Sequence, residues 1–324
     1  MKLQTTIPIS FAPPGISYDD CICMLGSCFT TEIGKKIQDS GFDVHIHSHG
    51  IVYNPHAIRQ CIQDILENRI YTHSDLIQYN GRWISLQHHG SFSSPNPEAI
   101  IEKINQNITL FHDALLKQGV LFITLGTFWV YRYKSTEKIV ANCHKIPSYF
   151  FEKLLLNLEE ETSAWIKLLE QIHDFNPRLR IIFTISPVKH LHDGFFENNL
   201  SKGMLHVLIH RILSRHTFPG YFPSYEIMQD ELRDYRFYDQ DLMHPNKLAV
   251  DIIWEKFSQQ YFTYSTKDIY NKTCRLISLW QHRIMDSTSA ETQTFIHKRK
   301  VETDLFQKEH PDIYARVIKG LEMG

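Results

Sequence analysis

Short apolar runs alternate with amphipathic segments along most of this chain, and this alternation constrains its fold more than any other feature. Parallel strands need long crossover connections, which are usually helices that cover both faces of the sheet. We therefore expect an α/β fold, a three-layer α/β/α sandwich around a mostly parallel five-stranded sheet. The expected strands are residues 20–25, 42–49, 119–126, 180–186 and 220–227.

Helical patterns separate these strands and continue after the last one. Residues 128–150 resemble a hairpin-bearing insertion, and from about residue 265 the chain is polar with no strand pattern. We expect an α/β domain at 1–264 with an insertion around 128–150, followed by a helical C-terminal extension at 265–324. The expected helices are residues 30–41, 55–68, 97–117, 158–175, 198–216, 245–261, 268–285 and 291–306.

Composition argues against several classes of function. A net charge of -2 over 324 residues provides no field for nucleic-acid binding. No apolar run is long enough to span a membrane, and the start of the chain lacks the apolar stretch of a signal peptide. Six cysteines without a leader are typical of free thiols in a reducing compartment. We therefore expect a cytoplasmic protein that binds neither nucleic acid nor membrane, and the oligomeric state stays open.

Gly26, Ser27 and Cys28 stand where the first strand gives way to a helix. Amides at a helix N-terminus stabilise an anion and lower the pKa of a thiol, so a nucleophile gains from this position. Such a nucleophile would lie beyond the carboxyl ends of the strands, where α/β sheets bind ligands. In the alternative interpretation, Ser27 only caps the helix and Cys28 is a small buried residue.

Asp241 precedes His244 by three residues, just before the last helix of the α/β region. In a turn, this spacing lets the carboxylate accept a hydrogen bond from Nδ1, which leaves Nε2 free to take a proton from a nucleophile. The D-x-x-H pattern alone is weak. It gains weight here because the first strand ends in a glycine followed closely by two potential nucleophiles.

Seven segments in the same order resemble the GSCFA-domain family over residues 19–262. They are LGSCF, HGIVYNP, LGTFWVY, NCHKIP, SPVKHLHDG, LSKGML and DELRDYRFYDQDLMHP. That family is grouped with the SGNH (GDSL-like) hydrolases. The resemblance implies an SGNH-like sheet, a nucleophile after the first strand, oxyanion-hole donors after the second and third strands, and D-x-x-H near the end. It identifies no substrate and implies no cofactor.

The family's G-D-S pattern places the nucleophile two residues after the glycine, which is Cys28 here. Ser27 stays the alternative if the turn is shifted by one residue. Gly50 matches the donor after the second strand. The third block, usually G-x-N-D, supplies Gly126 and Thr127 but has Phe128 where the asparagine would stand.

This departure leaves the third oxyanion donor open. Asn54 and Asn142 are candidate substitutes from nearby loops, and His144 is a candidate for the substrate cleft. The resemblance implies an esterase or acyltransferase for a small-molecule or carbohydrate acyl substrate, such as an O-acetyl sugar. The alternative is a non-catalytic protein that keeps the fold and binds a glycan or metabolite, an interpretation that Phe128 favours.

Nineteen histidines raise the question of a metal. His45, His47 and His49 would share one face if residues 43–49 form a strand. They could build a metal site with His88, His89, His190 and His192. Because no cysteine or carboxylate has a characteristic spacing to them, we expect no metal and no cofactor.

Three aromatic residues alternate along a predicted strand of the insertion. Trp129, Tyr131 and Tyr133 would lie on one face of it. Such a row either packs in the core or stacks on a sugar, and core packing is the expectation.

Overall fold

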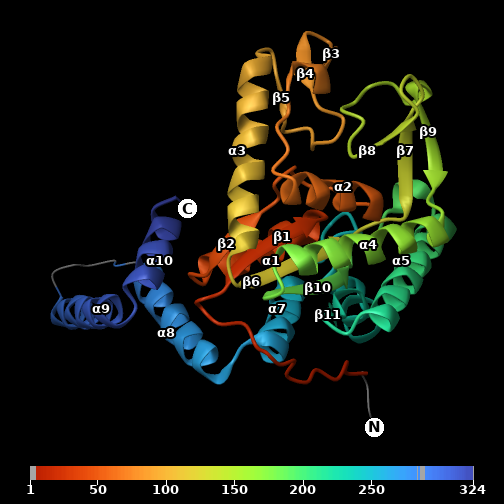
Figure 1. The fold of residues 1–324 in the computed structure, drawn as a ribbon. Helices are drawn as coiled ribbons and strands as arrows, with labels where there is room; N and C mark the ends of the chain where they lie inside the picture. Colours follow the sequence, from red (N-terminus) through yellow and green to blue (C-terminus); the bar gives the residue numbers. More distant parts are fainter. Residues whose placement is uncertain (1–4, 283, 285–288, 324) are drawn as a thin grey trace.

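The centre of the computed structural model is a five-stranded sheet with strand order β11-β10-β6-β1-β2 (Figure 1). Residues 5–282, 284 and 289–323 are described. Each neighbouring pair of strands is parallel. The expected α/β fold with a parallel five-stranded sheet is therefore confirmed. The strands are β1 (Cys21–Gly26), β2 (Asp43–Ile46), β6 (Gly119–Leu125), β10 (Leu179–Ile185) and β11 (Pro219–Phe222).

Helices cover both faces of this sheet, as the apolar strands require. Along β1, Cys21, Cys23 and Leu25 pack into one core cluster, whereas Ile22 and Met24 pack into another on the opposite face. The first face is covered by α2 (Pro55–Leu66), α3 (Pro97–Leu116), α4 (Leu158–Phe175) and α5 (Phe195–Arg215). The second is covered by α1 (Cys28–Asp39) and α7 (Lys247–Tyr261), which completes the expected three layers.

Two strands end earlier than expected, each for a local reason. β2 stops at Ile46 because His47 adopts a left-handed φ of 60° and the chain turns away. β11 stops at Phe222, directly before Pro223, because proline cannot donate the next ladder hydrogen bond.

Two small antiparallel sheets lie outside the main sheet. β7 (Trp129–Tyr133) pairs with β8 (Lys138–Val140) and β9 (Phe151–Leu155), so the expected insertion continues to Leu155. β3 (Ile77–Tyr79), β4 (Arg82–Ile84) and β5 (Ser93–Ser94) form the other, in a region with no expected element. Short helical turns are η1 (His73–Asp75), η2 (Ser148–Phe150), η3 (Leu191–Asp193), α6 (Ser224–Glu226), η4 (Ile227–Glu231) and η5 (Tyr235–Phe237).

The C-terminal region is helical, as expected, and it packs on the α/β core. It contains α8 (Tyr264–Gln281), α9 (Ala290–Glu309) and α10 (Pro311–Met323); α10 was not expected, and Met285 lies outside the described residues. Ile313 and Val317 of α10 belong to the same core cluster as α1. Arg316 Nε donates to the carbonyl oxygen of Gly41 at 2.7 Å. The domain boundary at residue 264 stays a prediction.

No helix within the described ranges combines the length and the apolarity that crossing a membrane would take.

Candidate active site

A tight turn after β1 delivers Cys28 to the carboxyl edge of the sheet. Gly26 has φ +135°, and a Cβ there would lie 2.2 Å from the carbonyl oxygen of Thr124, so only glycine fits. Ser27 then takes the N-cap position with an extended backbone, and Cys28 is the first residue of α1. The sequence thus places the thiol at a helix N-terminus.

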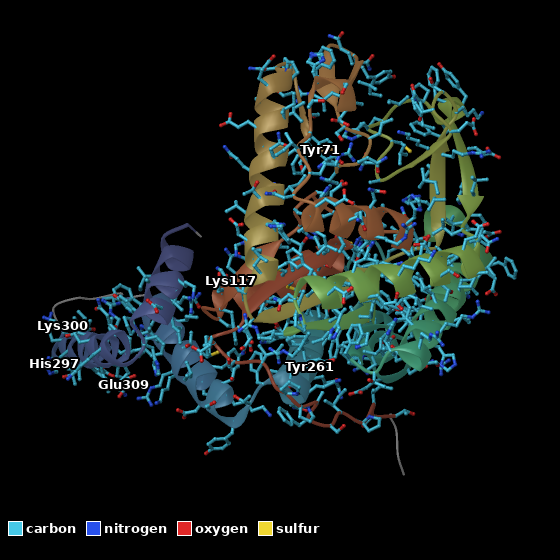
Figure 2. The ribbon with its side chains drawn as sticks, viewed as in Figure 1. Tyr71, Lys117, Tyr261, His297, Lys300 and Glu309 are labelled. Atoms are coloured by element: carbon cyan, nitrogen blue, oxygen red, sulfur yellow. The ribbon has the colours of Figure 1, made fainter. Side chains whose placement is uncertain are left out.

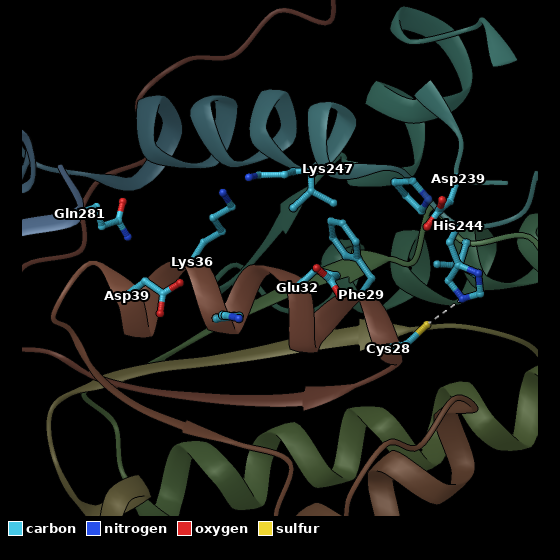
Figure 3. Close-up of a pocket in the computed structure, with 13 residues that line it drawn as sticks. Cys28, Phe29, Glu32, Lys36, Asp39, Asp239, His244, Lys247 and Gln281 are labelled. Atoms are coloured by element: carbon cyan, nitrogen blue, oxygen red, sulfur yellow. Dashed lines mark hydrogen bonds between the residues drawn. The ribbon is translucent and has the colours of Figure 1, made fainter. Parts of the chain in front are cut away.

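The structure brings Cys28, and not Ser27, to His244. Cys28 Sγ lies 3.6 Å from His244 Nε2, within reach of an S–H···N hydrogen bond (Figure 3). Ser27 is fully buried, and its Oγ has no hydrogen-bond partner. The register that places the nucleophile two residues after the glycine is therefore the one in which the side chain faces the imidazole.

Asp241 fixes His244 in the orientation that a general base requires. Asp241 Oδ2 accepts from His244 Nδ1 at 2.6 Å, which leaves Nε2 facing the sulfur. Its Oδ1 accepts from the backbone amides of Met243 (2.8 Å) and His244 (2.9 Å). The His244 amide, the Met243 amide and the imidazole together lower the pKa of Asp241 to about 2. The carboxylate is therefore ionised throughout the range in which proteins work.

The Cys28 thiol is not activated in the way the sequence suggested. Burial raises its pKa above the ordinary cysteine value, although the amides of Phe29 and Cys28 oppose this shift. The expectation that the helix N-terminus lowers the pKa of this thiol is therefore corrected. A thiol with a raised pKa is a poor nucleophile on its own near neutral pH.

Two cavities meet at the Cys28–His244 pair. The smaller, about 330 Å³, has an aromatic wall formed by Tyr53, Trp129 and Tyr131. The larger, about 730 Å³, has charged walls from α1 and the start of α7, and Figure 3 shows Gln281 of α8 at its far end. A ligand in either cavity has access to the thiol.

The backbone after β6 offers no free donor to this site. The amides of Gly126 and Thr127 both donate to the carbonyl oxygen of Tyr53, at 2.7 and 3.2 Å. Phe128 is buried in the core, and its amide donates to Ser201 Oγ at 2.6 Å. Thr127 still lines the aromatic cavity. The backbone of residues 126–128 therefore bonds to neighbouring segments of the chain. The family pattern would place an asparagine donor at the position of Phe128.

His190, in the loop after β10, occupies the space next to this block. Its Nε2 is buried without a hydrogen-bond partner and lies 3.4 Å from where a Cβ on Gly126 would stand. Burial, followed by the charge of Lys202, lowers the pKa of His190 to about 3, so the ring is neutral. His190 also lines the aromatic cavity with Cys28. From its sequence context, His190 was expected only as a candidate metal ligand.

A buried lysine, missed in the sequence, ties the loops after β6 and β10 together. Lys202 Nζ donates to the carbonyl oxygens of Gly126 (2.7 Å) and Ser186 (2.8 Å). Its complete burial lowers its pKa to about 7. A signal was present, because Lys202 lies three residues before Leu205 on the apolar face of α5.

Four residues that the sequence suggested for the oxyanion hole or the substrate cleft instead hydrogen-bond within loops or cap a helix. The Gly50 amide donates to the backbone carbonyl oxygen of His47, and the side chain of Asn54 caps α2 by accepting from the Ala57 amide. Asn142 Oδ1 accepts from the His144 amide. The ring Nε2 of His144 lies 2.8 and 2.9 Å from the carbonyl oxygens of Ser85 and His88. None of the four lines either cavity at Cys28 among the residues described.

The histidines of the HIHSH segment do not share a face, because β2 ends before His47. The ring of His47 contacts Thr31 Oγ1 at 2.9 Å. The ring of His49 is buried between Ser48 and Asp64 and stacks on His88. The expected one-faced row of histidines is therefore wrong.

The alternating aromatic residues of β7 divide between two roles. Trp129 and Tyr131 line the cavity next to Cys28, whereas Tyr133 packs on Phe151 with ring centroids 5.3 Å apart. Lys153 Nζ lies 4.7 Å above the Trp129 ring. Two of the three aromatics are thus available to a ligand.

Comparisons with known proteins give one family and several distant structures. The profile of the GSCFA family matches residues 21–257. No curated protein matches the chain significantly. A candidate platelet activating factor from Streptococcus pneumoniae is 10% identical, with a TM-score of 0.39, over 74% of this chain and 83% of its own.

Two carbohydrate esterases are also similar in structure. A family 2 enzyme with a carbohydrate binding domain from Corynascus thermopiles (Myceliophthora fergusii) is 13% identical, with a TM-score of 0.38, over 82% of this chain and 68% of its own. A family 3 enzyme from Clostridium thermocellum is 11% identical, with a TM-score of 0.33, over 78% and 97%.

Proposed function

The chain belongs to the GSCFA family, and we propose that it is an SGNH-like esterase or acyltransferase that uses Cys28, His244 and Asp241. One observation carries the proposal: Sγ and Nε2 lie 3.6 Å apart while Nδ1 is held by Asp241 at 2.6 Å. A nucleophile, a base and a residue that orients the base are the parts that acyl transfer needs.

The reaction begins from the neutral thiol. His244 Nε2 takes the proton while Sγ bonds to the acyl carbon, and the imidazolium then gives that proton to the departing alkoxide oxygen. The acyl group remains on Cys28 as a thioester. Water, or an acceptor hydroxyl, attacks this thioester with His244 again as base, which restores the thiol.

We further propose that His190 replaces the missing asparagine in the oxyanion hole. Its Nε2 is a polar atom without a partner beside the loops that carry Cys28 and Gly126, and the ring is uncharged. In the Nε2–H tautomer it would donate to the developing oxyanion, together with the amides of Cys28 and Phe29 at the start of α1.

The aromatic cavity favours an acylated carbohydrate as substrate. Tyr131 is 40% exposed, and with Trp129 it presents ring faces on which a sugar can stack. Asp193 and His192 line the same cavity and offer hydrogen bonds to hydroxyl groups. Six free cysteines fit a reducing compartment, so we propose the cytoplasm as its location.

Two observations favour a second candidate function. Burial keeps the Cys28 thiol protonated, and Phe128 supplies no side-chain donor. A binding protein that retains the fold and holds a glycan or metabolite in the same cavity would have these properties.

Hydrolysis of p-nitrophenyl acetate separates the two candidates. We expect turnover in the wild type and its loss in Cys28→Ala and in His244→Ala, with Ser27→Ala close to wild type because Oγ does not reach the imidazole. The same residual rate in wild type and His244→Ala would exclude the enzyme and leave the binding protein.

A further inference from the structure

A second group of reactive side chains lies at the amino-terminal end of the sheet. β1 and β2 are parallel neighbours, with Cys21 opposite Asp43 and Cys23 opposite His45. Side chains two residues apart on a strand point to the same face. Cys21 and Cys23 both pack into the cluster on the α3 side, and His45 contacts Phe111 of α3 on that side. The four side chains therefore share one face of two adjacent strands.

Three of these side chains already bring their ligand atoms together. One such atom from each of Cys21, Asp43 and His45 lies within 4.8 Å of the other two. His45 Nε2 is 3.6 Å from Asp43 Oδ1. This nitrogen atom is buried and has no hydrogen-bond partner, although other atoms of the side chain reach solvent. Across residues 5–282, 284 and 289–323, no other trio of histidine, cysteine or acidic side chains is grouped so closely.

We propose that Cys21, Asp43 and His45 bind a divalent metal ion of the zinc class, with Cys23 as the fourth ligand. Thiolate, imidazole and carboxylate are the ligands that zinc takes in tetrahedral sites. Adjacent strands lie about 4.8 Å apart, and Cys23 shares the face of the other three side chains, so it can complete four ligands around one ion. On binding, each thiol exchanges its proton for a bond to the metal, and the proton goes to solvent.

Lys117 pairs with Asp43 but does not occupy the carboxylate oxygen that faces His45. Its Nζ is 3.4 Å from Asp43 Oδ2, and it is the other oxygen, Oδ1, that faces His45. Figure 2 shows Lys117 at the end of α3, and its side chain is 55% exposed, so the ion pair is weak. Asp43 and His45 are 38% and 25% exposed on the edge strand β2, which gives an ion a path from solvent.

The position of the group indicates a structural role. At a rise of about 3.3 Å per residue, the start of β1 lies roughly 16 Å from its end at Gly26. An ion there would link edge strand β2 to β1, far from Cys28, and would stabilise the folded state by mass action. This site is independent of the proposed acyl chemistry at Cys28.

Cobalt(II) substitution tests the site on the full-length protein, purified without a histidine tag and stripped with a chelator. We expect one equivalent of Co²⁺ to produce a thiolate-to-cobalt absorption band and the intense visible bands of tetrahedral coordination. Zn²⁺ should displace the cobalt, abolish these bands and raise the melting temperature.

Cys21→Ser and His45→Ala should lose the bands, whereas Cys274→Ser, which removes an exposed thiol, should keep them. His45→Ala changes a half-buried edge position, so it addresses the site even if Cys21→Ser fails to fold. Absence of a thiolate band in the wild type, or an unchanged spectrum in His45→Ala, overturns the proposal. Cys28→Ala should bind cobalt like the wild type, and chelation should leave ester hydrolysis unchanged, so the two proposals fail separately.

Discussion

Cys28 Sγ lies 3.6 Å from His244 Nε2, although 216 positions separate the two residues in the chain. Packing explains the approach: α1, which begins at Cys28, and α7, which follows His244, share one core cluster on the same face of the sheet. A bond between the backbone amide of Asp239 and the carbonyl oxygen of His244, at 2.8 Å, closes the loop that carries the imidazole.

Asp241→Asn should lower kcat by about 10²- to 10⁴-fold, because an amide cannot hold the imidazole in the same tautomer or stabilise the imidazolium. Steady-state ester hydrolysis measures the effect. Asp234→Asn, which changes an exposed carboxylate that lines neither cavity at Cys28, is the matched control. Equal kcat values in Asp241→Asn and wild type would remove Asp241 from the mechanism.

His190→Ala should lower kcat by about 10²- to 10³-fold with little change in KM, because an oxyanion donor acts mainly in the transition state. His190→Gln keeps an N–H donor and should recover part of the loss. A rise in KM alone would show instead that His190 contacts the ground-state substrate.

Much of the fold and the hydrogen-bonded pair of Asp241 and His244 could be predicted because their signals are local. Apolar runs marked the strands, and Asp241 and His244 are close in sequence. The partners of Asn142 and His144 depend on how residues 85–88 pack against residues 142–144, a contact that no local pattern encodes. The Cys21–Asp43 pairing depends equally on the register between two strands.

Alkylation of Cys28 by iodoacetamide should rise with pH, with a midpoint above about 8.5, because burial disfavours the thiolate. Below its pKa the thiol is neutral and reacts slowly; above it the thiolate reacts. Peptide mass spectrometry across pH 5 to 11 locates the midpoint, and Cys28→Ser identifies the peptide. A midpoint well below 8.5 would indicate a preformed thiolate–imidazolium pair.

Lys202 should make stability increase with pH above neutrality. Its pKa is about 7 in the folded state and about 10.4 when unfolded, so between these values the unfolded state binds more protons. The free energy of unfolding then rises by about 1 kcal/mol per pH unit from this group. Urea unfolding at pH 7, 8 and 9 should show this slope in wild type relative to Lys202→Met. Parallel curves would contradict it.

A covalent bond between Cys28 and an acyl group is the central step of the proposed reaction. Wild-type protein mixed with an activated acetyl ester and quenched in acid within milliseconds should gain one acetyl group, mapped by mass spectrometry to the peptide that contains Cys28. His244→Ala should not acquire it on that timescale. Turnover of the ester with no acyl group on Cys28, or with the group on Ser27, would contradict the account.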